Sequence, residues 1–503
     1  MYEEKILNAD LLKKVVSVQE ATALIQSGMT IAMSGFAAGY PKAVPTELAA
    51  HSKATGVRML NAVSNSEKMD GVLARSDVLG FHGFFQDSRD MRGAVNEGRI
   101  DFCDCHLGLL ADKIRAGDYG KIDYAVMEAI FIDEDGSIAP ALSAGIDDVF
   151  VECAEKVIVE INTNYSLSLD GFCDFGRDAS KLTPPFVRTG PAHIPCPPGK
   201  IAAICFTDLM TDMPIYRPVD DVYAAIGDNI KKLLASEIEA GRLDREFTFQ
   251  SGVGGVANAV LSSLMKSGFK NLKMFTELMT DVPIHAMLDG VISDATTTGT
   301  SMEAETFALF SENLDFFKKH LVIRPTDVTN NGENIRCMGL VSMNTIVEAD
   351  IYGNTNSSHA MGSRIINGVG GSNDFARHAK LTIFMTPSTA RGGEISSIVP
   401  MVAHVDNTEH DADILVTEYG WADLRGKTPK QRAALIIENC AHPDYRPALQ
   451  QYFEDAVALC GPCQTPHDLD KALSWHSRFL KTGTMRENKS RMDENGKENC
   501  QAL

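Results

Sequence analysis

Two acidic side chains stand directly after apolar, strand-like runs, and they are the first candidates for chemistry. Glu277 follows Leu272–Thr276, and Glu418 follows Asp413–Thr417. In open α/β sheets, ligands bind outside the carboxyl ends of the strands. A carboxylate at that place can act as a nucleophile or as a base, although a Glu after a strand is also a common solvated surface residue.

Two glycine-rich turns could face these acids. Ser251-Gly-Val-Gly-Gly255 precedes a run with helical apolar spacing, Val256–Lys266, and Gly370-Gly371-Ser372 precedes the helix-like Asn373–Ala379. Glycine lets the backbone approach a ligand closely, and the free amides at a helix start suit an anion or a developing oxyanion. Two acids and two glycine turns therefore favour acyl chemistry over hydride transfer.

Other motifs give weaker signals. A dinucleotide site at Gly252-Val-Gly-Gly-Val-Ala257 would need a strand directly before it, and Phe247-Thr-Phe-Gln250 is a poor strand pattern, so this alternative stays open but disfavoured. The chain contains neither a Gly-x-Ser-x-Gly elbow nor a phosphate loop. Cys103-Asp-Cys105-His106 has no second ligand pair at zinc-like spacing, and the loop with His404, Asp406 and His410 reads equally well as a polar turn. We expect no metal.

Composition excludes several classes of protein. The 503 residues carry a formal charge of −20, which disfavours nucleic acid or an anionic membrane as partner. No 18-residue apolar run and no signal-like N-terminus are visible. The eleven cysteines follow no framework spacing, and Cys460-Gly-Pro-Cys463 lacks the strand that precedes a thioredoxin-like pair. We expect reduced thiols and a cytoplasmic location.

Strand-like and helix-like runs alternate along the chain and predict an α/β fold with mainly parallel sheets. A helix is expected from Ser17, whose spacing to Glu20 fits a capping box. The expected strands are Thr30–Ser34, Val57–Val63, Tyr124–Ala129, Lys156–Ile161, Ile201–Cys205, Leu272–Thr276, Leu321–Arg324, Met338–Met343, Leu381–Met385 and Asp413–Thr417.

The chain divides into two comparable parts. Residues 162–200 are rich in Pro, Gly, Asp and Thr and predict a long irregular excursion, and a charged helix at 222–245 links the parts. We expect one α/β domain at 1–230 and a second at 231–503. The sequence from Ser34 to Ala62 is similar to the sequence from Ser251 to Glu277, which suggests an internal repeat, although any two βαβ units share some likeness. If the repeat is real, only the second copy carries an acid at its strand end, which favours one site between the halves.

Several motifs resemble a known family. They are Ser34-Gly-Phe…Gly39-Tyr-Pro-Lys-Ala-Val-Pro-Thr, Gln250-Ser-Gly-Val-Gly…Ala257-Asn-Ala-Val, Glu348-Ala-Asp-Ile-Tyr-Gly-Asn-Thr-Asn, Asn367-Gly-Val-Gly-Gly-Ser-Asn-Asp-Phe-Ala-Arg377, Ile398-Val-Pro-Met-Val-Ala-His-Val-Asp and Ala422-Asp-Leu-Arg-Gly. The chain is similar to the acetyl-CoA hydrolase/transferase family of class I CoA-transferases, above all to those that use succinyl-CoA and acetate. The likeness is dense over 246–485 and weaker before that.

The resemblance implies two similar open α/β domains with the active site between them. It implies Glu277 as nucleophile, an oxyanion hole from the amides of Val253 and Gly371, and further active-site positions at Asn330 and Glu418. Contacts to the CoA substrate are expected around Gly254, Gly370, Ser372 and Ser64. Coenzyme A is then a co-substrate, no cofactor is tightly bound, and a homodimer is expected.

The implied reaction passes CoA from a short-chain acyl-CoA to a carboxylate through a γ-glutamyl-CoA thioester on Glu277. Departures from the family leave the acyl group open: Thr211, with Arg217 slightly beyond, stands where a basic residue is expected, and Tyr419 stands where Gln is expected. A propionyl, butyryl or other short acyl group is the alternative to acetyl and succinyl. A thioesterase and a non-catalytic CoA-binding protein are the alternatives.

Overall fold

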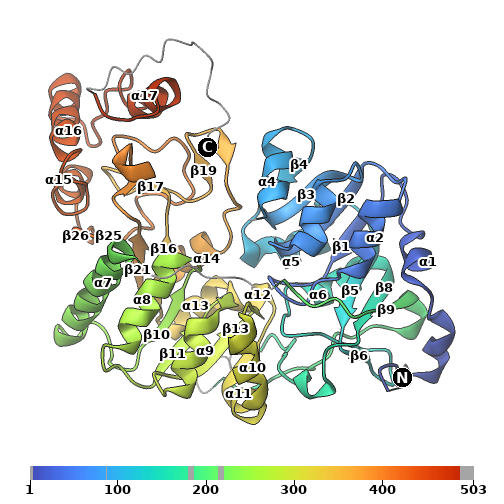
Figure 1. Cartoon of the computed structure of the whole chain (residues 1–503). Coiled ribbons are helices and arrows are strands. Elements are labelled where there is room, and N and C mark those ends of the chain that lie inside the picture. Colours follow the sequence, from blue (N-terminus) through green and yellow to red (C-terminus); the bar gives the residue numbers. More distant parts are fainter. Residues whose placement is uncertain (1–3, 87, 179–185, 213–219, 488–503) are drawn as a thin grey trace.

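Two parallel sheets, one in each half of the chain, form the framework of the protein (Figure 1). The structure is a computed structural model and describes residues 4–86, 88–178, 186–212 and 220–487. Arg217 lies outside these ranges. No helix among them is both long enough and apolar enough to cross a bilayer.

The first sheet has the strand order β4-β3-β2-β1-β5-β8-β9, and each neighbouring pair is parallel. The strands are β1 Thr30–Met33, β2 Val57–Ser64, β3 Leu79–Gln86, β4 Asp101–Cys103, β5 Ile122–Ala129, β8 Ala154–Asn162 and β9 Ile201–Thr207. Most residues of β1, β5 and β8 are buried, as expected for strands covered on both faces.

The second sheet has the order β15-β13-β11-β10-β16-β21-β25-β26. Its strands are β10 Thr248–Ser251, β11 Leu272–Phe275, β13 Ile292–Thr297, β15 Leu321–Ile323, β16 Val341–Thr345, β21 Leu381–Met385, β25 Ile414–Thr417 and β26 Gly420–Asp423. All pairs are parallel except β25 with β26. Apart from β26, the order repeats that of the first sheet strand by strand, which confirms two similar α/β halves.

The expectation that Phe247–Gln250 is a poor strand is wrong, because β10 is a central strand of the second sheet. Its pattern is misleading because Gln250 is buried inside the sheet. The Gln250 side chain donates to Asn344 Oδ1 (2.9 Å) and accepts from Ser342 Oγ (3.1 Å), both on the neighbouring β16. A polar residue that is fully hydrogen-bonded can occupy a core position.

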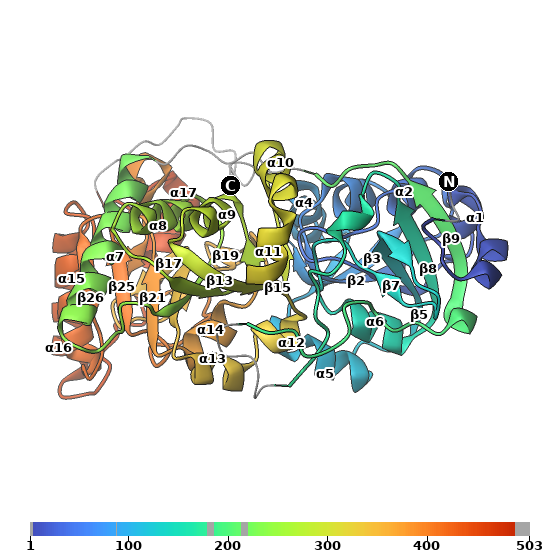
Figure 2. The same cartoon turned by 90° about the horizontal axis from the view of Figure 1, so that it is seen from below.

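Helices cover both faces of each sheet (Figure 2). Those of the first half are α1 Val18–Thr22, α2 Ala43–His51, α3 Val72–Ala74, α4 Arg89–Asn96, α5 Leu110–Arg115 and α6 Asp147–Cys153. Those of the second half include α8 Gly255–Met265, α9 Asp281–Leu288, α10 Ala304–Glu312, α11 Leu314–His320, α12 Thr326–Thr329, α13 Gly332–Met338 and α14 Ser372–His378. The predicted capping box of Ser17 and Glu20 is present at α1.

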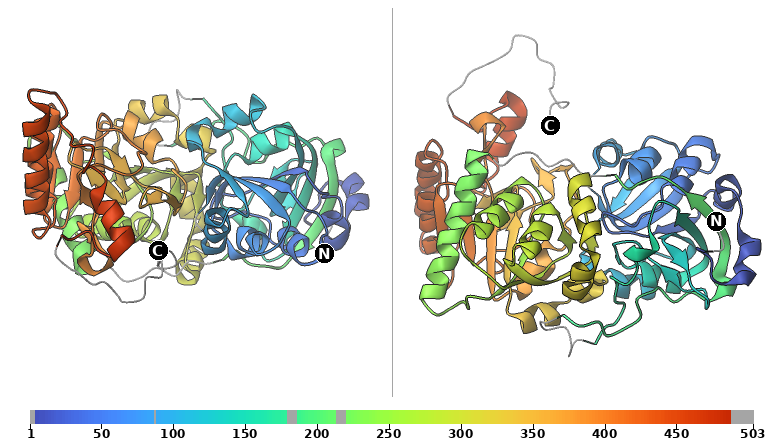
Figure 3. Two further views of the ribbon diagram at one scale, coloured as in Figure 1. Left: turned by 90° about the horizontal axis from the view of Figure 1, so that it is seen from above. Right: turned by 60° about the horizontal axis from the view of Figure 1, so that its bottom comes forward.

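Helix α7 (Asp221–Glu239) sets the division between the halves. The predicted boundary after residue 230 falls inside this helix. In Figures 1 and 3, α7 lies beside α8 and the C-terminal strands of the second sheet, and its Asn229 side chain donates to Thr417 O (2.9 Å). We therefore assign α7 to the second half and place the division between β9 and α7.

The C-terminal segment adds a separate core to the second half. A small sheet of β17 (Glu348–Asp350), β18 (Thr355–Asn356) and β24 (Ile398–Val399) packs with α15 Pro429–Asn439, α16 Arg446–Cys460 and α17 Ser474–Thr482. Figure 1 shows this part at the end of the molecule farthest from the first half.

The two halves are bonded directly to each other. Ala144 N donates to Thr298 O (2.8 Å), and Thr326 N donates to Gly145 O (2.8 Å). The irregular excursion expected at 162–200 also crosses this interface, because Asp174 forms an ion pair with Arg324 (3.1 Å) in which both side chains are 0% exposed. These contacts fix the strand ends of the second sheet against the first half.

Candidate active site

Glu277 follows β11 at the carboxyl edge of the second sheet, as predicted. Its backbone carbonyl accepts from Thr298 N (2.8 Å), Gly299 N (3.1 Å) and Thr297 Oγ1 (2.9 Å). Gly299 in turn forms a β-bridge with Ser143 of the first half. The backbone of Glu277 is therefore held rigidly where the halves meet.

The carboxyl group of Glu277 lies against Asn330 and Gly371. Asn330, which follows α12, donates through Nδ2 to Glu277 Oε1, and the backbone amide of Gly371 also bonds the carboxyl group. Burial raises the pKa of Glu277 to about 8, and the charge of nearby Asp374 adds to the rise. The structure thus brings together three of the predicted residues and adds Asp374.

The turn before α14 requires glycine. A Cβ on Gly371 would lie 1.6 Å from Glu277 Oε1 and 2.2 Å from Asn330 Nδ2, so any side chain there would displace the carboxyl group. Gly370 has a left-handed φ of 61°. The buried Oγ of Ser372 has no hydrogen-bond partner within the described residues. This turn presents polar groups to whatever lies beside Glu277.

The second glycine turn, Ser251–Gly255, lies next to the strand end that carries Glu277. Ser251–Gly255 connects β10 to α8, and Thr276 Oγ1 donates to Ser251 O (3.0 Å), which ties the turn to the residue before Glu277. The side chain of Val253 is 47% exposed, and Gly254 has a φ of 104°. Both predicted residues therefore stand at the same sheet edge as Glu277.

Glu418 lies at the same sheet edge but outside this cluster. Glu418 follows β25, four strands from β11 at the same edge, which corresponds to about 19 Å. Its carboxylate accepts from the backbone N of Ser388 (2.8 Å) and from the Ser388 hydroxyl. Ser64 is the last residue of β2, at the carboxyl edge of the first sheet.

The first half contributes residues that sequence reasoning missed. Asp104 Oδ2 accepts from Val369 N (2.7 Å), and Gly108 N donates to Asp374 Oδ2 (2.9 Å). The one signal in the sequence is the stretch Cys103–His106, whose residue types are those of metal ligands. Within the described residues no group of three or more His, Cys, Asp or Glu could hold a metal ion. Asp104 instead fixes the loop that leads to Gly371.

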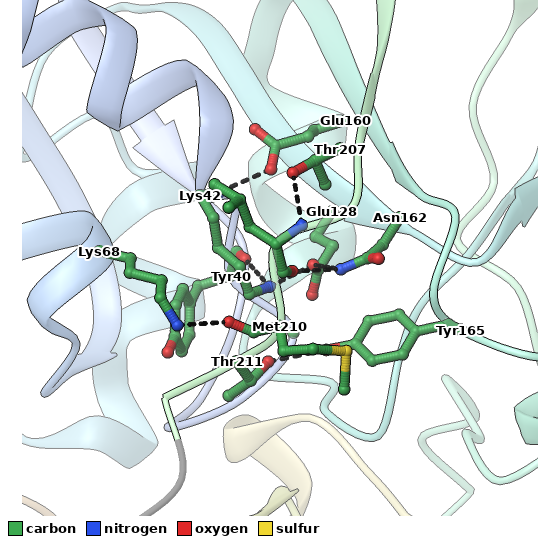
Figure 4. A network of polar contacts seen from close by, with 12 residues as sticks. Tyr40, Lys42, Lys68, Glu128, Glu160, Asn162, Tyr165, Thr207, Met210 and Thr211 are labelled. Atoms are coloured by element: carbon green, nitrogen blue, oxygen red, sulfur yellow. Dashed lines mark hydrogen bonds and ion pairs between the residues drawn. The ribbon is translucent and has the colours of Figure 1, made fainter.

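The strand ends of the first half are filled by the protein's own polar groups (Figure 4). Lys42, fully buried, pairs with Glu128, whose carboxylate also accepts from Asn162 Nδ2 (3.0 Å). The carboxylate of Glu160 accepts three backbone amides at the start of α2, those of Lys42, Ala43 and Val44. Both carboxylates are therefore paired within the first half.

The segment around Thr211 packs against the same strand ends of the first half. Thr211, which stands where a basic residue was expected, bonds Tyr165 through the two hydroxyl groups (2.7 Å), and Lys68 donates to Met210 O (2.7 Å) (Figure 4). Beside it lies a cavity of about 50 Å³ lined from both halves, including Thr211 and Thr300.

Comparison with known protein families agrees with this architecture. The "Acetyl-CoA hydrolase/transferase N-terminal domain" matches residues 2–176, and the "Acetyl-CoA hydrolase/transferase C-terminal domain" matches residues 307–453. The chain belongs to the acetyl-CoA hydrolase/transferase family. The likeness inferred from the sequence motifs is therefore confirmed.

Named relatives of the chain fall into two activity classes. A succinyl-CoA:acetate CoA-transferase of Clostridium kluyveri is 42% identical over 96% of this chain and 92% of its own length. A propanoyl-CoA:succinate CoA transferase of Escherichia coli is 35% identical over 93% and 98%. An acetyl-CoA hydrolase of Candida albicans is 35% identical over 96% and 98%. Transferases and hydrolases are thus similar to this chain over nearly its whole length.

Solved structures share the fold. RipA from Yersinia pestis aligns with a TM-score of 0.69 at 20% identity, covering 91% of this chain and 98% of its own. A 4-hydroxybutyrate CoA-transferase from Porphyromonas gingivalis aligns with a TM-score of 0.64 at 23% identity, covering 90% and 100%. The two-part α/β architecture is therefore common to these proteins.

Proposed function

We propose that the protein is a CoA-transferase that moves CoA from a short-chain acyl-CoA, such as succinyl-CoA or acetyl-CoA, to a carboxylate such as acetate. The observation that carries the proposal is the Glu277 carboxyl group, held between the halves against Asn330 and the Gly371 amide. The 42% identity to a succinyl-CoA:acetate CoA-transferase supports the substrate class. Coenzyme A is a co-substrate in this proposal, and no tightly bound cofactor takes part.

In the first step, a carboxylate oxygen of Glu277 attacks the thioester carbonyl carbon of the acyl-CoA. The carbon–sulfur bond breaks, which gives an acyl-glutamyl anhydride and CoA thiolate. The raised pKa of Glu277, about 8, makes the carboxylate a stronger base and nucleophile once it is ionised. Burial also keeps water away from the anhydride.

In the second step, the thiolate attacks the side-chain carbonyl carbon of Glu277, and the acyl group leaves as a carboxylate. The product is a γ-glutamyl-CoA thioester, which an acceptor carboxylate opens by the reverse sequence. The amides of Asn330 and Gly371 already point at the glutamyl carboxyl group, where the negative charge develops when the thiolate attacks the glutamyl carbon. One such donor contributes about 3–4 kcal/mol in comparable sites.

The remaining predicted residues take supporting roles in the proposal. The amide of Val253 would face the acyl oxygen from the neighbouring strand end, and Gly254, Gly370 and Ser372 would line the approach of CoA. Glu418 and Ser64 would contact the distal part of the substrates. The homodimer and the cytoplasmic location stay predictions.

A hydrolase is the second candidate, because similar proteins are named acetyl-CoA hydrolases at 35–36% identity. It would form the same anhydride, which water would then intercept. Exchange of labelled acetate into acetyl-CoA separates the two, since it requires the thioester energy to be kept on the protein.

The decisive experiment is the intact mass of the protein after incubation with acetyl-CoA or succinyl-CoA without acceptor, followed by borohydride. A CoA adduct that borohydride converts to an alcohol at Glu277 is the expected result. Turnover without an adduct would favour the hydrolase. If neither adduct nor turnover occurred across short acyl-CoAs, Glu277 would not be a nucleophile and the chain would be a CoA-binding protein.

A further inference from the structure

Asp374 stands in the first turn of α14 and faces the site from behind Asn330. Its Oδ2 atom accepts two hydrogen bonds, one from Asn330 Nδ2 (3.0 Å) and one from Gly108 N (2.9 Å). The residue makes no hydrogen bond to Glu277, but its charge acts on the Glu277 carboxyl group. Asp374 is therefore connected to the proposed nucleophile, Glu277, through the side chain of Asn330.

Both N–H groups of the Asn330 side-chain amide are hydrogen-bonded. An amide nitrogen has two N–H donors, and here one donates to Glu277 and the other to Asp374. On the opposite side, Asn330 Oδ1 accepts from Thr329 Oγ1 (2.9 Å), which itself bonds Thr298 Oγ1 (2.7 Å). A flipped amide would turn its oxygen toward two carboxyl groups, so these contacts admit one orientation.

The first half of the chain enters the same arrangement through Gly108. A Cβ at this position would lie 2.6 Å from Asn330 O and 3.2 Å from Asp374 Cγ, so the two halves meet here without a side chain between them. The amide of Gly108 reaches Asp374 only when the halves are docked. The orientation of Asn330 is thus linked to the interface.

We propose that Asp374 is a positioning residue that holds the N–H of Asn330 toward the Glu277 carboxyl group and makes this orientation depend on docking of the first half through Gly108. The inference rests on the proposed role of Glu277 as nucleophile. An Asn330 amide held in this way donates to the glutamyl oxygen in the carboxylate, in the anhydride and in the thioester. Without Asp374, the amide could rotate and present its oxygen to the same atom.

The charged groups around Glu277 and Asp374 determine how the pH profile of adduct formation should respond to a substitution. Glu277 is faced by Asp374, and Asp374 is faced by His106 of the first half and by His378 on its own helix. Burial raises the pKa of Asp374 above its ordinary value, and its hydrogen bonds and the two histidines only partly oppose this rise. Removing the Asp374 charge therefore lowers the pKa of Glu277. Loss of the Asn330 hydrogen bond would act in the opposite direction, because that bond lowers the pKa of Glu277.

The test measures the rate of CoA-adduct formation on Glu277 in the full chain, under single-turnover conditions from about pH 6 to pH 9. Asp374→Asn keeps an oxygen that can accept from Asn330 and Gly108, and we expect a rate within about fivefold of wild type and a profile displaced to lower pH. Asp374→Ala is expected to lower the rate by about 10²-fold while KM for the acyl-CoA changes little, because the site is misaligned rather than blocked. Asp411→Asn is the control, since Asp411 pairs with Arg377 on the exposed side of the same helix.

The outcomes separate this inference from the proposed function. If wild type forms the adduct and folded Asp374→Asn and Asp374→Ala match it in rate and pH profile, the positioning role is wrong and the nucleophile stands. A loss of rate proportional to the loss of folded protein, with an unmoved profile, would also overturn the positioning role. If wild type itself forms no adduct, both proposals fall together.

Discussion

The raised pKa of Glu277 predicts that this carboxyl group destabilises the fold at alkaline pH. The folded-state pKa is about 8, against 4.5 for the exposed group. Between these values the folded protein holds a proton that the unfolded chain has lost, so stability falls as pH rises. Glu277→Gln keeps the shape and the oxygen that accepts from Asn330 but removes the titration, so the variant should gain stability over wild type as pH rises.

The size of the effect follows from the two pKa values. The penalty on wild type is about 1.4 kcal/mol at pH 5.5 and about 4.6 kcal/mol at pH 8.5, so the advantage of Glu277→Gln should grow by about 3 kcal/mol across this interval. If one half of the chain unfolds as a unit, a change of 1 kcal/mol in the free energy of unfolding moves the thermal midpoint by roughly 2 °C. The difference in midpoint between variant and wild type should therefore widen by roughly 6 °C.

The assay is calorimetric unfolding of both proteins at a series of pH values. Glu237→Gln is the matched control: its side chain is 3% exposed, and Arg242 and Arg425 lower the pKa of Glu237 to about 2. The Glu237 carboxyl group is then ionised in both states throughout the interval, so the difference between that variant and wild type should stay constant with pH. A constant difference for Glu277→Gln as well would refute the argument that the Glu277 carboxyl group is held in a desolvated place.

Two further predictions test the packing around the site. Gly371→Ala places a Cβ 1.6 Å from Glu277 Oε1, so the rate of adduct formation in single turnover should fall by about 10³-fold while thermal unfolding changes by only a few degrees; a rate within tenfold of wild type would contradict the close approach. Arg324→Ala leaves the buried carboxylate of Asp174 unpaired, and the free energy of unfolding in urea should fall by about 3–5 kcal/mol; a loss below about 1 kcal/mol would mean that this pair does not hold the halves together.

The sequence by itself determined the α/β architecture and predicted Glu277 as the residue at the centre of the candidate site. Strands such as Lys156–Ile161 and Leu381–Met385 are mostly apolar and do not alternate, because a parallel sheet is covered on both faces. Helix starts on glycine turns and the acid after β11 are likewise local features, readable from neighbouring residues. Local periodicity was therefore enough to expect two α/β halves with Glu277 at a strand end.

Only the tertiary structure decided what surrounds Glu277. Gly108 and Asp374, or Asp104 and Val369, lie more than 260 positions apart in the chain and meet because the two halves dock. The wrong prediction for strand β10 also arises from contacts between distant segments. Gln250 can occupy the core only because its hydrogen-bond partners lie on β16. Burial of apolar residues follows a local pattern, whereas a buried polar group requires a specific partner, and that partner is supplied by the packing of distant segments.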